Sequence, residues 1–110
     1  MELAFETVGL RHVCESDLEA RKCFPQGTVE ELQARLADMR AAKSVSDLVA
    51  GKPYFDPHPP GRIRFGLDGG YELMCVGNHP RPTLTGDGLI DFSRMRRVKI
   101  VTIAQGRRNG

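Results

Sequence analysis

Apolar and polar residues alternate with two different periods, which divide the chain into a helical first part and a β-rich second part. In the first part, apolar residues three or four apart form one stripe on a helix: Val29, Leu32, Leu36 and Met39. A Thr-x-x-Glu capping box at residues 28–31 predicts where this helix begins, and we expect it to continue to about Ala42. Glu31 and Arg35 are four residues apart on the polar side and are expected to pair. The apolar stripe is expected to face the core.

Shorter elements flank this helix. Residues 3–8 are predicted to be a strand, and Ser16, three residues before Glu19, predicts a capped short helix that ends at residues 25–27. A short capped turn is expected at residues 44–48. Proline and glycine are frequent in residues 51–61 and 77–88, which predicts two loops.

The pattern changes in the second part of the chain. Residues 62–67 alternate strictly between apolar and other positions, as in a strand with one buried face. Asp68-Gly69-Gly70 predicts a hairpin turn. Residues 71–76 are nearly all apolar, which is typical of a central strand buried on both faces, and residues 98–104 form a third β-rich run. Residues 105–110 are expected to be a frayed tail.

These elements predict one α+β domain over residues 1–110, with the N-terminal helices packed on one face of an antiparallel sheet of three to four strands. No apolar run approaches the roughly 20 residues that span a bilayer. The N-terminus lacks the basic start and long apolar stretch of a signal peptide. We therefore expect a cytoplasmic protein with no membrane partner.

The hairpin register predicts which side chains share a face of the sheet. A three-residue turn pairs Leu67 with Tyr71 and, further along, Phe65 with Leu73 and Ile63 with Cys75, and these six residues should cover the helix. The opposite face should carry the following residues: Arg62, Arg64, Gly66, Glu72, Met74 and Val76. The planar guanidinium of arginine suits phosphate, so this face is a candidate RNA-binding surface. The alternative is an ordinary exposed face with a cross-strand ion pair between Arg64 and Glu72.

The charge distribution gives a second candidate surface. Net charge is only +2, but basic residues gather near the C-terminus: Arg94, Arg96, Arg97, Lys99, Arg107 and Arg108. This asymmetry predicts either a face for an anionic partner or a merely solvated edge. Aromatic residues make up 6% of the chain, and the predicted strands expose none for base stacking, so a generic nucleic-acid module is less favoured.

Three cysteines, Cys14, Cys23 and Cys75, form no CxxC pair and are expected to be reduced packing residues. The cysteines and histidines lack the spacing of zinc ligands, so no zinc site is expected.

Three segments resemble one family when taken in order. Residues 32–48 resemble the long helix and the "AA-x-S-x-x-DL" turn of HigB-like killer proteins. Residues 71–74 and 78–82 resemble the "YRLIF" strand and the "N-x-P-x-P" loop after it. Residues 87–94 and 98–100 resemble "DGGIDWSKVTAIRI". Together they cover residues 28–103, and the chain therefore resembles toxins of the RelE/ParE superfamily of type II toxin–antitoxin systems.

The resemblance implies N-terminal helices on a strongly bent antiparallel sheet. It also implies cleavage of mRNA on the ribosome that needs no metal and no other cofactor, in which a ribose 2′-OH attacks the adjacent phosphate. A cognate antitoxin, of helix-turn-helix type, is the expected partner, with the toxin a monomer or part of a small toxin–antitoxin complex. Candidate catalytic residues are Arg62, Arg64, Lys99, His58 and His79. Candidate RNA-binding residues are Arg62, Arg64, Arg94, Arg96, Arg97 and Lys99.

Two departures from the family pattern leave a second function open. Glu72 stands where the family strand carries arginine, and the family's C-terminal "DYH" ending is absent from residues 102–106. His58 or His79 could replace the missing acid–base group. The alternative is a non-catalytic protein on the same fold, either a gyrase-type toxin or an inactive toxin homologue.

Overall fold

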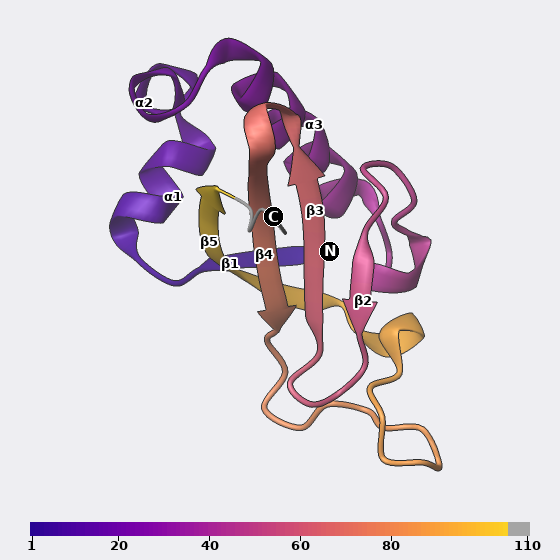
Figure 1. Ribbon diagram of the computed structural model, residues 1–110. Helices are drawn as coiled ribbons and strands as arrows, with labels where there is room; N and C mark the ends of the chain where they lie inside the picture. The colour runs from indigo at the N-terminus through magenta and orange to yellow at the C-terminus, as the bar shows by residue number, and fades with distance from the viewer. Residues whose placement is uncertain (106–110) are drawn as a thin grey trace.

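The computed structural model describes residues 1–105 of the chain (Figure 1). The helices are α1 (Val8–Glu15), α2 (Asp17–Cys23) and α3 (Gln26–Ala41), with short 3-10 turns η1 (Val45–Asp47), η2 (Asp68–Gly70) and η3 (Phe92–Arg94). The strands are β1 (Glu2–Phe5), β2 (Tyr54–Asp56), β3 (Arg62–Leu67), β4 (Tyr71–Gly77) and β5 (Arg97–Gln105). The broad α+β class is therefore as predicted. The predicted tail lies outside the described residues except for Gln105, which ends β5.

The sheet has five strands in the order β1-β5-β4-β3-β2. Strands β2 to β5 pair antiparallel, but β1 pairs parallel with β5, with Leu3 opposite Val98. The prediction of a purely antiparallel sheet of three to four strands is therefore wrong. A parallel pair needs a long connection between its two strands. Here the three helices and strands β2 to β4 lie between β1 and β5 in the chain. Strand β2 was missed because its three residues lie between Pro53 and Pro57, in a segment whose composition predicts a loop.

Helix α3 buries the predicted stripe: Val29, Leu32, Leu36 and Met39 are at most 2% exposed. It begins at Gln26 rather than Thr28, because Pro25 takes the N-cap position. Thr28 is buried inside the helix, and its Oγ1 donates to the Asp68 carbonyl at 2.6 Å, so the predicted capping box at residues 28–31 is wrong. Arg35 pairs with Asp38 at 3.1 Å instead of with Glu31.

Two of the predicted caps are confirmed. The Ser16 hydroxyl accepts from the Glu19 amide at 3.2 Å and begins α2, and Ser44 caps η1. Helix α1 was not predicted, because β-branched Val8 and then Gly9 are weak helix formers and read as an extension of the first strand. The Thr7 hydroxyl, which accepts from the Leu10 amide at 3.0 Å, starts this helix instead.

The β3–β4 hairpin has the predicted register, with Leu67 opposite Tyr71 and Ile63 opposite Cys75. The turn is possible because Gly69 and Gly70 have φ values of 81° and 78°, which favour glycine. The prediction that β4 is buried on both faces is wrong. Only Leu73 and Cys75 are buried, whereas the alternate residues Glu72, Met74 and Val76 are partly exposed.

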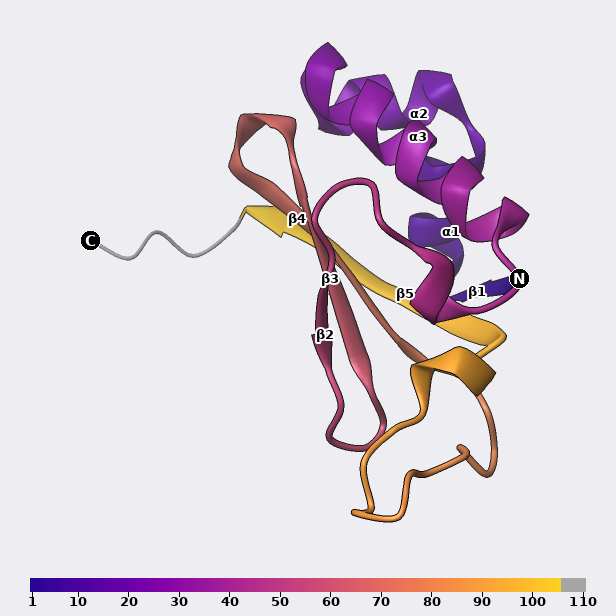
Figure 2. The same cartoon turned by 90° about the vertical axis from the view of Figure 1, so that its right-hand side faces the viewer.

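This burial pattern follows from the layers of the molecule. Figure 2 shows α1, α2 and α3 on one side of the sheet, together with η1 and η3. The core lies between these segments and the sheet. No helix among residues 1–105 combines the length and apolar character that crossing a membrane requires. The side of the sheet that faces away from the helices is called the open face below.

Candidate nucleic-acid interface

Arg62 and Arg64 are exposed on the open face of β3, as the hairpin register predicts. Arg62 lies opposite Asp56 on β2 and opposite Val76 on β4. Val76 in turn lies opposite Lys99 on β5. Arg62 and Lys99 therefore lie in one row, two strand spacings or about 10 Å apart. The structure brings these two cations to the same surface from strands that are far apart in sequence.

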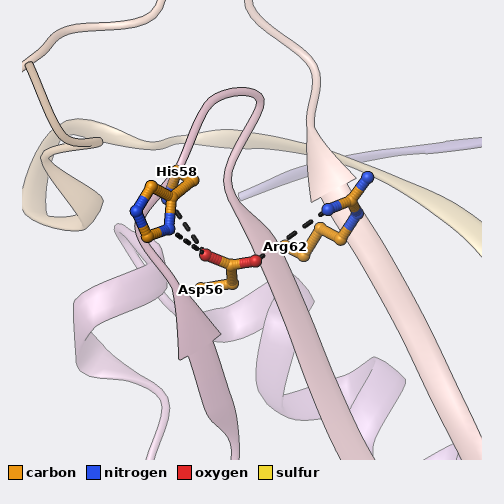
Figure 3. Close-up of polar contacts among 3 residues, drawn as sticks. All are labelled: Asp56, His58 and Arg62. Carbon is orange, nitrogen blue, oxygen red and sulfur yellow. Dashed lines mark hydrogen bonds and ion pairs between the residues drawn. The ribbon is translucent and has the colours of Figure 1, made fainter.

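The most organised polar group on this face joins Asp56, His58 and Arg62 (Figure 3). Asp56 Oδ1 accepts the His58 backbone N–H at 3.1 Å and lies 2.9 Å from His58 Nδ1. Asp56 Oδ2 lies 3.9 Å from Arg62 Nη1. An aspartate readily bonds the amide two residues on, so the local sequence Asp56-Pro57-His58 favours this turn at the end of β2. These three residues are called the Asp–His–Arg cluster.

Asp56 fixes which nitrogen carries the proton when the imidazole is neutral. Hydrogen bonds from the His58 side chain and then from its backbone lower the pKa of Asp56 below its ordinary value of 3.8, with a smaller contribution from Arg62. The ionised carboxylate can only accept, so His58 Nδ1 must donate. In the neutral imidazole, Nε2 therefore carries a free lone pair that can accept a proton. The His58 side chain is 77% exposed. Asp56 was not selected from the sequence, although the Asp-x-His spacing was a signal for it.

Arg64 occupies the next row of the open face. It lies opposite Tyr54 on β2 and opposite Met74 on β4, diagonal to Glu72. Within residues 1–105 no ion pair joins Arg64 to Glu72, so the expected cross-strand pair is not formed. Tyr54 is 61% exposed. The expectation that the strands expose no aromatic residue is therefore wrong, because the proline-rich composition around β2 predicts a loop there.

Comparison of the chain with protein-family models, curated proteins and solved structures gives no match. A function for this chain is therefore inferred from the side chains of the open face.

The remaining basic candidates are divided between surfaces. Lys99 pairs with Glu6 at 3.0 Å and Arg97 with Glu2 at 2.8 Å, both next to the edge strand β1. Arg94 lies in η3, on the helix side of the sheet (Figure 2), and is 3.8 Å from Asp91. The structure therefore does not bring Arg94 together with Arg62 and Arg64. Arg96 is exposed and, within the described part of the chain, makes no ion pair.

His79 has a contact that differs from that of His58. Its Nε2 accepts the backbone N–H groups of Arg96 at 3.0 Å and Arg97 at 3.2 Å. This lone pair is used to join the loop after β4 to the start of β5. Of the two candidate histidines, His58 is the one whose Nε2 is available to a substrate.

A hollow of about 510 Å³ lies beside β1, and its lining includes Glu2, Ala4, Asn78 and Arg97. It does not include the Asp–His–Arg cluster, which lies on an exposed surface instead. An exposed row of cations with one oriented imidazole suits a polymer laid across the sheet better than an enclosed small molecule.

The cysteines do not add a nucleophile to this face. Burial raises the pKa of the Cys14 thiol to about 11 and raises that of Cys75 further, so both stay protonated near neutral pH. Both are packing residues as predicted, but Cys23 is exposed, which corrects the expectation for that residue. Among residues 1–105, no three His, Cys, Asp or Glu side chains gather closely enough to hold a metal ion.

Proposed function

We propose that this chain is the toxin component of a type II toxin–antitoxin system, with a RelE-like fold, and that it cleaves mRNA on the ribosome. The observation that carries this proposal is the Asp–His–Arg cluster. It combines an exposed imidazole of fixed tautomer with a guanidinium, through one shared carboxylate. An oriented base next to a cation is what cleavage by an internal 2′-OH requires.

The chemistry assigns one role to each member of the cluster. His58 Nε2 takes the proton from a ribose 2′-OH, and the 2′ oxygen forms a bond to the adjacent phosphorus. The bond from phosphorus to the 5′ oxygen breaks, and that oxygen takes a proton from water. The products are a 2′,3′-cyclic phosphate and a 5′-hydroxyl end. Asp56 stabilises the imidazolium formed in this step, and Arg62 stabilises the charge on the phosphoryl oxygens.

Arg64 would contact a flanking phosphate on the same face, whereas Lys99 lies near the β1 edge and pairs with Glu6. An antitoxin of helix-turn-helix type is the proposed partner. Covering the open face would neutralise the toxin, because it would hide His58 and the arginines together.

A second candidate, a non-catalytic binding protein on the same fold, is favoured by one observation. Glu72 lies on the open face, between Gly66 and Ala104 in the register, so its carboxylate faces the side where phosphate would approach. A negative charge there would weaken RNA binding and would suit a protein target.

Induced expression in a bacterial host tests the two candidates. A toxin that cleaves mRNA should arrest growth, and primer extension should show new breaks within translated regions. His58→Gln removes the base and should lower the yield of breaks by about 100-fold or more. His12→Gln is the matched control, because His12 is an exposed histidine on α1.

Breaks that persist at the wild-type level in His58→Gln would refute the assigned mechanism. Growth arrest with intact transcripts would reject cleavage and favour the protein-targeting candidate.

A further inference from the structure

We infer that Tyr54 and Arg64 form a platform that stacks one unpaired base and holds its neighbouring phosphate, so that the open face binds single-stranded RNA. The choice of RNA as the polymer rests on the proposed function. The platform itself rests on the register, exposure and charge of these two residues, which no part of the proposed cleavage step uses.

The exposure of Tyr54 is the first observation. Tyr54 is 61% exposed at the edge of the sheet. The next residue, Phe55, points to the opposite face and packs on Phe92 with ring centroids 5.1 Å apart. Strand β2 thus gives one aromatic ring to the core and one to the open face. The ring of Phe55 packs in the core, whereas the ring of Tyr54 presents a flat apolar surface to solvent, as a base-stacking residue does.

Arg64 supplies the second observation. It lies directly opposite Tyr54, which places their Cβ atoms about 4.5–5.5 Å apart. Within residues 1–105 its guanidinium has no carboxylate partner, in contrast to Arg62, which lies near Asp56. A guanidinium beside an exposed ring can bind the phosphate of the nucleotide whose base stacks on that ring.

The spacing to the Asp–His–Arg cluster is the third observation. Tyr54 and Asp56 are two residues apart on β2, and Arg64 and Arg62 are two residues apart on β3, so the two rows are about 6.6–6.8 Å from each other. A base stacked on Tyr54 would hold an adjacent ribose near His58. In a duplex the bases are paired and stacked on each other, so this platform favours an unpaired strand.

Binding of a ten-nucleotide oligoadenylate RNA with 2′-O-methyl groups, followed by fluorescence anisotropy, tests this inference without requiring cleavage. Tyr54→Ala should weaken binding about tenfold, and Tyr54→Phe should retain the wild-type affinity because it keeps the ring. A duplex of the same length should bind more weakly and should not respond to Tyr54→Ala. Val49→Ala is the matched control, because Val49 is 80% exposed and precedes β2.

Equal affinity of Tyr54→Ala and the wild type for the single strand would overturn the platform, as would an equal loss on the duplex. Thermal denaturation of each variant checks that folding is intact. Equal binding of the single strand by Tyr54→Ala and the wild type, together with His58-dependent breaks, would refute the platform and leave the proposed cleavage standing. Tyr54-dependent binding without His58-dependent breaks would support the platform and refute the cleavage.

Discussion

Asp56 uses both of its carboxylate oxygens, one for His58 and one toward Arg62. It therefore orients one side chain while it partly neutralises another. Arg64, two residues along β3 from Arg62, has no such partner within the described residues. Neighbouring arginines on the same strand should thus differ in how freely they contact phosphate.

The lowered pKa of Asp56 predicts a dependence of stability on pH. A carboxyl group whose pKa is lower in the folded than in the unfolded state stabilises the fold above its ordinary pKa of 3.8. This stabilisation is lost as the pH falls through the folded pKa. Wild type should therefore unfold at higher urea concentration than Asp56→Asn near pH 7, and the difference should shrink as the pH falls below 3.8. A difference that stays constant over this range would show that Asp56 acts through packing.

Replacing Arg62 and Arg64 together with alanine should abolish toxicity and leave folding almost unchanged. Both side chains are exposed, and the ion pair that they form within residues 1–105, between Arg62 and Asp56, lies at the surface and should contribute little to stability. Growth after induction measures toxicity, and urea denaturation measures the free energy of unfolding.

The control for this double variant removes two exposed cations from α2. Arg21 and Lys22 are 58% and 62% exposed and also form surface ion pairs. Arg21→Ala with Lys22→Ala should keep the toxicity. A stability loss of more than about 2 kcal/mol in the Arg62, Arg64 variant would assign these residues to structure instead.

At the scale of elements, the sequence predicts helices and strands most accurately where apolar residues keep one helical or strand period over several residues. The stripe on α3 and the alternation in β3 specify their buried faces, and the Asp68-Gly69-Gly70 turn determines the register of the hairpin. The open face with Arg62 and Arg64 follows from that register alone. Strand β2 could not be predicted, because three residues between prolines are too few to show a period. Tyr54 and Asp56 were missed for this reason.

The link between α3 and the β3–β4 hairpin gives a prediction about an element. Thr28 is fully buried, and its hydroxyl donates to the Asp68 carbonyl at 2.6 Å. Thr28→Val keeps the shape but removes the hydrogen bond to this carbonyl, which belongs to an exposed residue that water can reach, so the variant should lose about 0.5–1.5 kcal/mol in urea denaturation. Thr85→Val, at an exposed loop position, should change stability by less than about 0.5 kcal/mol. Equal stability of Thr28→Val and the wild type would show that packing alone joins the two elements.

At the scale of the whole molecule, the helices cover one side of the sheet and leave the other to solvent (Figure 2). The parallel pairing of β1 with β5 places the carboxylates of Glu2 and Glu6 beside Arg97 and Lys99, so the β1 edge is nearly neutral. At the opposite edge, β2 and β3 carry Tyr54, Arg64 and the Asp–His–Arg cluster. We therefore expect RNA to lie across β2 and β3 rather than across the whole sheet.

Nuclear magnetic resonance of the isolated chain, titrated with the 2′-O-methyl oligoadenylate, tests most directly whether the open face binds RNA. The backbone amide resonances of β2, β3 and residues 57–61 should shift, and those of α2 and the outer side of α3 should stay unchanged. Shifts confined to the helices, or no shifts at all, would contradict the account.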